Sequence, residues 1–147
     1  MNKPDAPLPR APAPAAVLEA ALYVDNLDAA ADFYGRVMGL AEELRVPGRH
    51  VFFRVGATIL LLFDPRVTAQ GSSDPRMPVP AHGADGPGHL CFAASRHDIT
   101  AWRDRLIAAG HPIEADFDWP GGARSIYFRD PAGNSIEIAE PRLWYDE

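Results

Sequence analysis

Apolar and polar positions follow the same succession of periods in both halves of the chain. In the first half, residues 18–24 read as a strand, and a stripe of helical spacing follows, formed by Leu27, Ala30, Tyr34 and Val37. Asn26 can cap this helix and Gly39 can end it. Three short strands are predicted next, separated by Pro-Gly and Gly-Ala pairs, at residues 42–46, 50–55 and 58–63.

The second half repeats this order from residue 89 onward. Residues 89–95 read as a strand, Ser95 with Asp98 resembles a capping box, and a helical stripe follows, formed by Ile99, Trp102 and Leu106. Gly110 and Pro112 end this helix. Strands are predicted at residues 113–117, 124–129 and 135–139. Repetition at this scale is a fold-level signal, and it makes Glu19 and His89 equivalent positions near the start of each half.

The predicted fold class is therefore α+β, with two βαβββ modules. A segment rich in Pro, Gly and Ser connects them, and a connection of this length is either a linker or an active-site lid. The N-terminal stretch is rich in Pro and Ala and lacks periodicity, which predicts a disordered tail. The predicted boundaries are 1–16 for this tail, 17–64 for the first module, 65–87 for the connection, 88–140 for the second module and 141–147 for a C-terminal tail.

Composition narrows the functional classes. The 147 residues are 47% hydrophobic, which suits one compact domain or two small half-domains with a shared core. A net charge of −6 argues against nucleic acids and anionic membrane surfaces as partners. No apolar run approaches the roughly 18–20 residues of a membrane span, and no secretory signal begins the sequence. The single cysteine, Cys91, excludes an internal disulfide, and we expect a cytoplasmic protein.

Glu137 is the position that raises a chemical question. It stands between Ile136 and Ile138 in the last predicted strand, so alternation places its side chain on the opposite face from both isoleucines. That face looks either into water or into a site. A carboxylate in a buried site needs a proton, a cation or a metal ion.

Three motifs carry a resemblance to a known family, namely YVDNLDAAADFYGRVMGL, GPGHLCFA and YFRDPAGNSIEI. Together they resemble the vicinal oxygen chelate superfamily, which includes glyoxalase I, extradiol dioxygenases, methylmalonyl-CoA epimerase, fosfomycin-resistance thiol transferases and bleomycin-resistance proteins. The resemblance covers residues 17–140. It implies that the two modules form a cupped mixed sheet around the site. One fold serves both metal-dependent enzymes and metal-free binders, so the resemblance alone does not fix the reaction.

The resemblance also implies a set of metal ligands on the first and last strands of the modules. Carried over to this chain, these are Glu19, His89 and Glu137, whereas Leu61 occupies the fourth position and cannot bind a metal. A histidine is usual where Glu19 stands. One imidazole and two carboxylates favour Fe(II) or Mn(II), with Zn(II), Ni(II) and Mg(II) also possible.

Further residues are candidates for contact with a substrate. Glu19 is a ligand or a general base, and the resemblance nominates Tyr127 as a hydrogen-bond donor to the substrate, with a core tyrosine as the alternative. Arg54 would clamp an anionic group or form a salt bridge at the rim. The predicted substrate-binding residues are Tyr23, His50, Arg54, Trp119 and Arg124. Trp119 and Arg124 flank a glycine-rich loop that either closes over a ligand or is a plain hairpin.

The function expected from these observations is a divalent-metal-dependent enzyme acting on a small oxygen-bearing molecule. Dioxygenase-like chemistry comes first because three protein ligands are counted. A glyoxalase I-like lyase or isomerase is the first alternative. A metal-free small-molecule binding protein of the bleomycin-resistance type is the second. The expected partners are a small-molecule substrate and a second copy of the chain in a homodimer.

Overall fold

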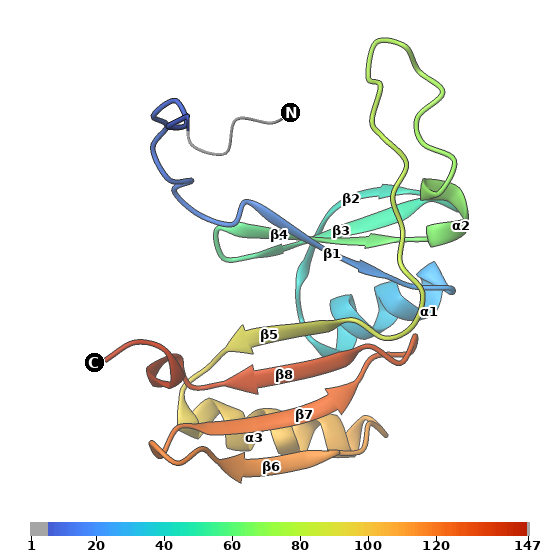
Figure 1. The fold of residues 1–147 in the computed structure, drawn as a ribbon. Coiled ribbons are helices and arrows are strands. Elements are labelled where there is room, and N and C mark those ends of the chain that lie inside the picture. The colour runs from blue at the N-terminus through green and yellow to red at the C-terminus, as the bar shows by residue number, and fades with distance from the viewer. Residues whose placement is uncertain (1–5, 147) are drawn as a thin grey trace.

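The computed structural model describes residues 6–146, and it contains two modules of the same topology (Figure 1). In the first, β1 (Glu19–Tyr23) leads through helical turns to β2 (Ala41–Val46), β3 (His50–Val55) and β4 (Thr58–Phe63). These strands form one sheet in the order β1-β4-β3-β2. β1 runs parallel to β4, and the other pairs are antiparallel.

The second module repeats this arrangement. It contains β5 (His89–Ala93), α3 (Arg96–Ala108), β6 (Ala115–Asp118), β7 (Arg124–Arg129) and β8 (Ser135–Ala139), with the sheet order β5-β8-β7-β6. β5 is parallel to β8, as β1 is to β4. The prediction of two βαβββ modules with mixed sheets is confirmed.

The helix starts follow the capping residues read from the sequence. The side chain of Asn26 accepts a hydrogen bond from the Ala29 amide at the start of α1 (Leu27–Asp32), and Ser95 does the same for Asp98 at the start of α3. The first predicted helix differs in its second half, where residues Phe33–Val37 form a π-helical turn. Phe33, Tyr34 and Val37 are all buried, so this turn brings successive large side chains onto the core.

The two modules share one core. A single cluster of buried apolar residues includes members of both sheets, of α1 and of α3. The rings of Phe33 in the first module and Phe128 in the second have centroids 6.2 Å apart. The Tyr34 hydroxyl donates to Asp130 Oδ2 at 2.7 Å in the interior, and the Asn134 side chain donates to the Tyr23 carbonyl. Both apolar packing and buried hydrogen bonds therefore fix the modules relative to each other.

The connection between the modules contains one short helix, α2 (Pro65–Thr68), and then runs without regular structure to β5. The strand expected at residues 113–117 lies at Ala115–Asp118, and the predicted C-terminal tail contains a 3-10 turn, Pro141–Leu143. The bounds of β1, β2 and β5 differ from the predicted ones by one or two residues. Residues 6–18 form no regular element, and the rest of the predicted N-terminal tail, like residue 147, lies outside the described residues. In the part of the chain that the structure describes, no helix has the length and apolar character needed to cross a membrane.

Candidate functional site

His89 and Glu137 meet on one face of the second sheet. β5 and β8 run parallel, with His89 opposite Ser135 and Cys91 opposite Glu137. The Nε2 atom of His89 lies 3.3 Å from Oε1 of Glu137. Glu137 is only 5% exposed, so its carboxylate is held away from bulk water. The face opposite Ile136 and Ile138 therefore carries a buried carboxylate beside an imidazole.

The hydrogen bond on the other side of the ring defines what His89 can offer to this carboxylate. Nδ1 lies 2.9 Å from the Ser135 carbonyl oxygen, which can only accept, so Nδ1 carries the hydrogen. In the neutral ring, Nε2 then turns a lone pair toward a carboxylate oxygen that also carries lone pairs. This contact is favourable only with a positive charge between the two atoms, either a proton on Nε2 or a metal ion.

Ser125 and Trp119 hold the second oxygen of Glu137. The Ser125 hydroxyl donates to Oε2 at 2.6 Å, and the Trp119 indole N–H donates to the Ser125 oxygen at 2.8 Å. The sequence analysis proposed Trp119 as a substrate contact and did not name Ser125. Alternation along β7 was the available signal, because Ser125 shares a face with Tyr127, but a serine there carries no distinctive motif.

Cys91 and Tyr127 complete the surroundings of Glu137. Burial, reinforced by the charge of the nearby Glu137 carboxylate, raises the pKa of both the Cys91 thiol and the Tyr127 hydroxyl to about 12. Both groups therefore keep their hydrogens at neutral pH. The Tyr127 ring stacks along His89 on one side and Phe117 on the other, each with centroids 6.0 Å apart. Among the described residues, no Arg or Lys pairs with Glu137.

The first module lacks an equivalent of Glu137. Ala21 on β1 pairs with Leu61 on β4, as Cys91 pairs with Glu137 in the second module. Leu61 therefore stands at the repeated position, as the sequence alignment of the two halves predicts. Its side chain is buried and cannot bind a metal ion.

Glu19 begins β1 and is exposed. Over residues 6–146, the chain brings together no group of three His, Cys, Asp or Glu side chains that would hold a metal ion. Two of the three predicted ligands, His89 and Glu137, thus meet within one chain, and Glu19 does not join them there. Its role as a ligand or base stays a prediction.

Tyr23 and His50 lie on one face of the first sheet, where they flank Phe63 on neighbouring strands. The Tyr23 hydroxyl is 2.7 Å from Nδ1 of His82, a residue of the connection between the modules. The His50 ring lies flat on Phe52, with centroids 4.2 Å apart, and neither of its buried nitrogens has a hydrogen-bond partner within the described chain. This face is rich in aromatic side chains, whereas the His89 face combines aromatic rings with the buried carboxylate of Glu137.

The two predicted arginine contacts lie elsewhere. Arg54 forms an ion pair with Glu43 on the neighbouring strand, which is the salt bridge considered as its alternative role. Arg124 pairs with Asp116 and donates to Thr100 of α3. α3 covers the face of β7 opposite to Tyr127, so Arg124 points away from Glu137. Both arginines thus pair with carboxylates of the same chain, and their contact with an anionic substrate stays a prediction.

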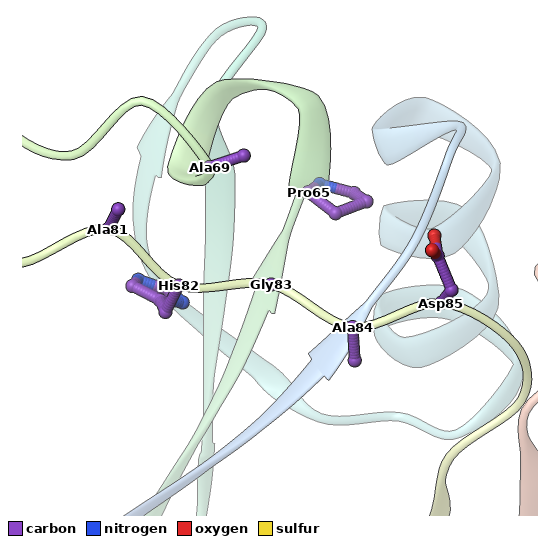
Figure 2. Close-up of a pocket in the computed structure, with 7 residues that line it drawn as sticks. All are labelled: Pro65, Ala69, Ala81, His82, Gly83, Ala84 and Asp85. Atoms are coloured by element: carbon purple, nitrogen blue, oxygen red, sulfur yellow. The ribbon is translucent and has the colours of Figure 1, made fainter.

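The connection between the modules runs over the edge of the first sheet. Figure 2 shows residues 81–85 along one side of an open pocket, with Pro65 and Ala69 across from them. Further along, residues 84–88 line a smaller cavity of about 180 Å³ together with Tyr23 and His89. Tyr23 of the first module and His89 of the second therefore border the same space.

The comparison with known families agrees with this architecture. Residues 16–138 match the model of the Glyoxalase/Bleomycin resistance protein/Dioxygenase superfamily. The chain belongs to this superfamily. The resemblance inferred from the three motifs is confirmed.

The chain is also similar to several solved structures. A lactoylglutathione lyase from Agrobacterium tumefaciens is 46% identical and superimposes with a TM-score of 0.85, over 91% of this chain and 99% of that one. A glyoxalase/bleomycin resistance protein/dioxygenase from Nocardioides is 25% identical, with a TM-score of 0.69 over 88% and 85% of the two chains. TioX from Micromonospora sp. ML1 is also 25% identical, with a TM-score of 0.66 over 85% and 98%. No curated protein matches the chain.

Proposed function

We propose that the chain is a metal-dependent lyase or isomerase of the glyoxalase type, with His89 and Glu137 as metal ligands. The observation that carries this proposal is the contact between His89 Nε2 and the buried Glu137 carboxylate, 3.3 Å apart with no Arg or Lys pairing with Glu137 in the described chain. A buried carboxylate without a countercharge is costly. A divalent cation placed between the two groups would remove that cost.

The donor groups suit a first-row divalent metal ion. His89 donates its Nδ1–H to a backbone carbonyl, the outer-shell contact that commonly fixes the tautomer of a metal-binding histidine. One imidazole and one carboxylate leave several coordination positions for a third protein ligand, solvent and substrate. Glu19 is the predicted third ligand, supplied by the same chain after movement of β1 or by a partner chain in the predicted homodimer. Fe(II) and Mn(II) remain the favoured ions on the donor set.

The chain's own residues would orient the substrate and move its protons. When bound, the metal ion supplies Lewis acidity that polarises two neighbouring substrate oxygens. Tyr127 keeps its hydrogen at neutral pH and would donate it to a substrate oxygen beside Glu137. A lyase of this type must shift a proton between adjacent carbons, and Glu19, predicted as a ligand or a general base, is the candidate carboxylate for this step. The stacked rings of Tyr127 and Phe117 would limit the access of water.

The similarity to a lactoylglutathione lyase changes the order of the alternatives. The 46% identity to a lactoylglutathione lyase makes a lyase reaction a better proposal for this chain than ring cleavage. Such a lyase would convert a thiol adduct of an oxoaldehyde to a 2-hydroxyacyl thioester. The argument for dioxygenase-like chemistry required three protein ligands for the metal ion. Within the described part of one chain, only two of the predicted ligands, His89 and Glu137, lie together. Dioxygenase-like chemistry remains the second candidate because the protonated Tyr127 lies beside His89, where a donor to a bound catechol is expected.

A metal-free binding protein is the third candidate. The aromatic face formed by Tyr23, His50, Phe52 and Phe63 would accept an apolar ligand without any metal ion. In this case a proton on His89 would compensate the charge of Glu137.

Metal analysis tests the proposal first. We expect wild-type protein that is purified without added metal or chelator to contain about one metal ion per site formed by His89 and Glu137. Titration with Fe(II), Mn(II), Ni(II) and Zn(II) should give the same stoichiometry. His89→Ala and Glu137→Gln should both lose this ion, whereas His97→Ala, at an exposed position of α3, should retain it. If the wild-type protein binds none of the four ions, the metalloenzyme proposal is contradicted and the metal-free binding protein is favoured.

The reaction is tested on the metal-loaded protein. Formation of the S-lactoylglutathione thioester from glutathione and methylglyoxal, absent in Glu137→Gln, would support the lyase. Consumption of O₂ with catechols and no thioester formation would replace it with the dioxygenase.

A further inference from the structure

We propose that Trp119 and Ser125 form a hydrogen-bond relay that fixes the orientation of the Glu137 carboxylate, reserving Oε2 for the protein and leaving Oε1 for a ligand. The relay itself is a property of the unliganded chain. Its effect on metal affinity rests on the proposed function. Neither residue contacts the reacting atoms in this proposal, so both are positioning residues.

The chemistry of the three groups fixes the direction of the relay. An indole N–H can only donate, so the Ser125 oxygen accepts from Trp119 Nε1 at 2.8 Å. The hydroxyl hydrogen is then free to go to the Glu137 carboxylate, 2.6 Å away. A hydroxyl that already accepts a hydrogen bond donates more strongly, and the carboxylate makes the second bond charge-assisted. The relay therefore has one stable arrangement.

Burial makes the arrangement hard to replace. Ser125 is completely buried, and Glu137 is 5% exposed. If the Ser125 hydroxyl were removed, the Trp119 N–H and one carboxylate oxygen would both lose their partners where water has little access. The carboxylate would then rotate to seek other donors, such as the Tyr127 hydroxyl or the Cys91 thiol beside it. Rotation would move Oε1 away from His89.

The hairpin between β6 and β7 positions the indole. The Trp119 amide donates to the Ala123 carbonyl at 2.8 Å, and the Gly122 amide donates to the Trp119 carbonyl at 2.7 Å. Gly122 has φ +93°, a conformation that other residues rarely adopt. The Trp119 ring also packs on Phe117, with centroids 4.9 Å apart. The glycine-rich loop is thus a hydrogen-bonded hairpin. It fixes the position of Trp119, which contacts Glu137 through Ser125.

The first experiment uses the metal-free full-length chain. Its three tryptophans give three indole N–H resonances after ¹⁵N-tryptophan labelling. Trp119→Phe and Trp102→Phe assign the signals. We expect Ser125→Ala and Glu137→Gln each to shift the Trp119 indole resonance, and Glu43→Gln, an exposed glutamate of the other sheet, to leave it in place. A Trp119 resonance that does not respond to Glu137→Gln would overturn the relay.

The second experiment measures the consequence at the site by Zn(II) titration. Ser125→Ala and Trp119→Phe should weaken Zn(II) binding about 10- to 100-fold, as loss of an outer-shell partner commonly does. Ser125→Thr, which keeps the hydroxyl, should restore it, and Trp102→Phe should not weaken it. Unchanged affinity in folded Ser125→Ala and Trp119→Phe would contradict the reservation of Oε1. If wild type binds no metal, the proposed function fails, and the indole resonances still decide the relay.

Discussion

At the scale of single residues, the strand pattern predicts which way Glu137 points, and the tertiary contacts show which residues it meets. Alternation along the last strand placed Glu137 opposite two isoleucines but left open whether its face looks into water, and the structure shows that all three side chains are buried. The partners of Glu137 come from β5, which is distant in sequence, and from β7, which directly precedes β8. His89 was predicted from its motif, whereas Ser125 was identified only from its hydrogen bond to Oε2 of Glu137.

His50 provides a residue-scale prediction on pH. Burial, with a smaller effect from the charge of Arg49, lowers the pKa of His50 below its usual value. A depressed folded-state pKa means that protonation favours unfolding, so the stability is complete above the unfolded-state pKa near 6.5 and falls as the pH decreases below it. We expect the urea midpoint of wild type to fall more steeply between about pH 7 and 5 than that of His50→Phe, which keeps the stacking on Phe52. Equal slopes would exclude His50 as a contributor.

At the scale of elements, most strands and both main helices follow from periodicity, caps and glycines. The limits of β3, β4, β7 and β8 agree with the prediction. Two elements differ for tertiary reasons. The helix after Asn26 changes to a π-helical turn because Phe33, Tyr34 and Val37 are all buried in the shared core. β6 begins later than its apolar pattern indicated, where its pairing with β7 starts at Ala115 and Tyr127.

The β6–β7 hairpin gives an element-scale prediction with neighbouring glycines as a matched pair. Gly122→Ala should destabilise the protein by about 1–2 kcal/mol, because φ +93° is strained for a residue with a Cβ. Gly121→Ala should change the free energy of unfolding by less than about 0.5 kcal/mol, since nothing lies within 4 Å of an added Cβ there. Chemical denaturation of both variants measures the difference. Equal losses would mean that the turn does not depend on Gly122.

At the scale of the whole molecule, the site depends on how the two modules dock. Tyr23 of the first module and His89 of the second border one cavity, and residues 84–88 also line it. Asp130, in the turn between β7 and β8, accepts from Tyr34 and also holds Asn134, whose side chain reaches the Tyr23 carbonyl. The turn therefore connects the strand of Glu137 to the first module.

Tyr34→Phe tests this docking. Removal of the hydroxyl breaks the buried bond to Asp130 and should reduce the free energy of unfolding by about 1–3 kcal/mol, since the acceptor is a buried carboxyl group. Tyr145→Phe, at an exposed position near the C-terminus, should be neutral. Both values come from urea denaturation at one pH. A neutral Tyr34→Phe would mean that apolar packing alone fixes the modules.

The sequence by itself determined the doubled βαβββ order, the family, the repeated Leu61 position and the pair His89 and Glu137. The doubled order recurs at a fixed spacing and follows from periodicity, whereas the family, the Leu61 position and the two site residues follow from motifs that resemble those of known proteins. Only the tertiary structure decided which carboxylate each arginine pairs with, that Glu19 stays apart within one chain, and that Ser125 and Trp119 hold Glu137. Those outcomes depend on side-chain contacts between paired strands, and no local pattern records which donor meets which acceptor.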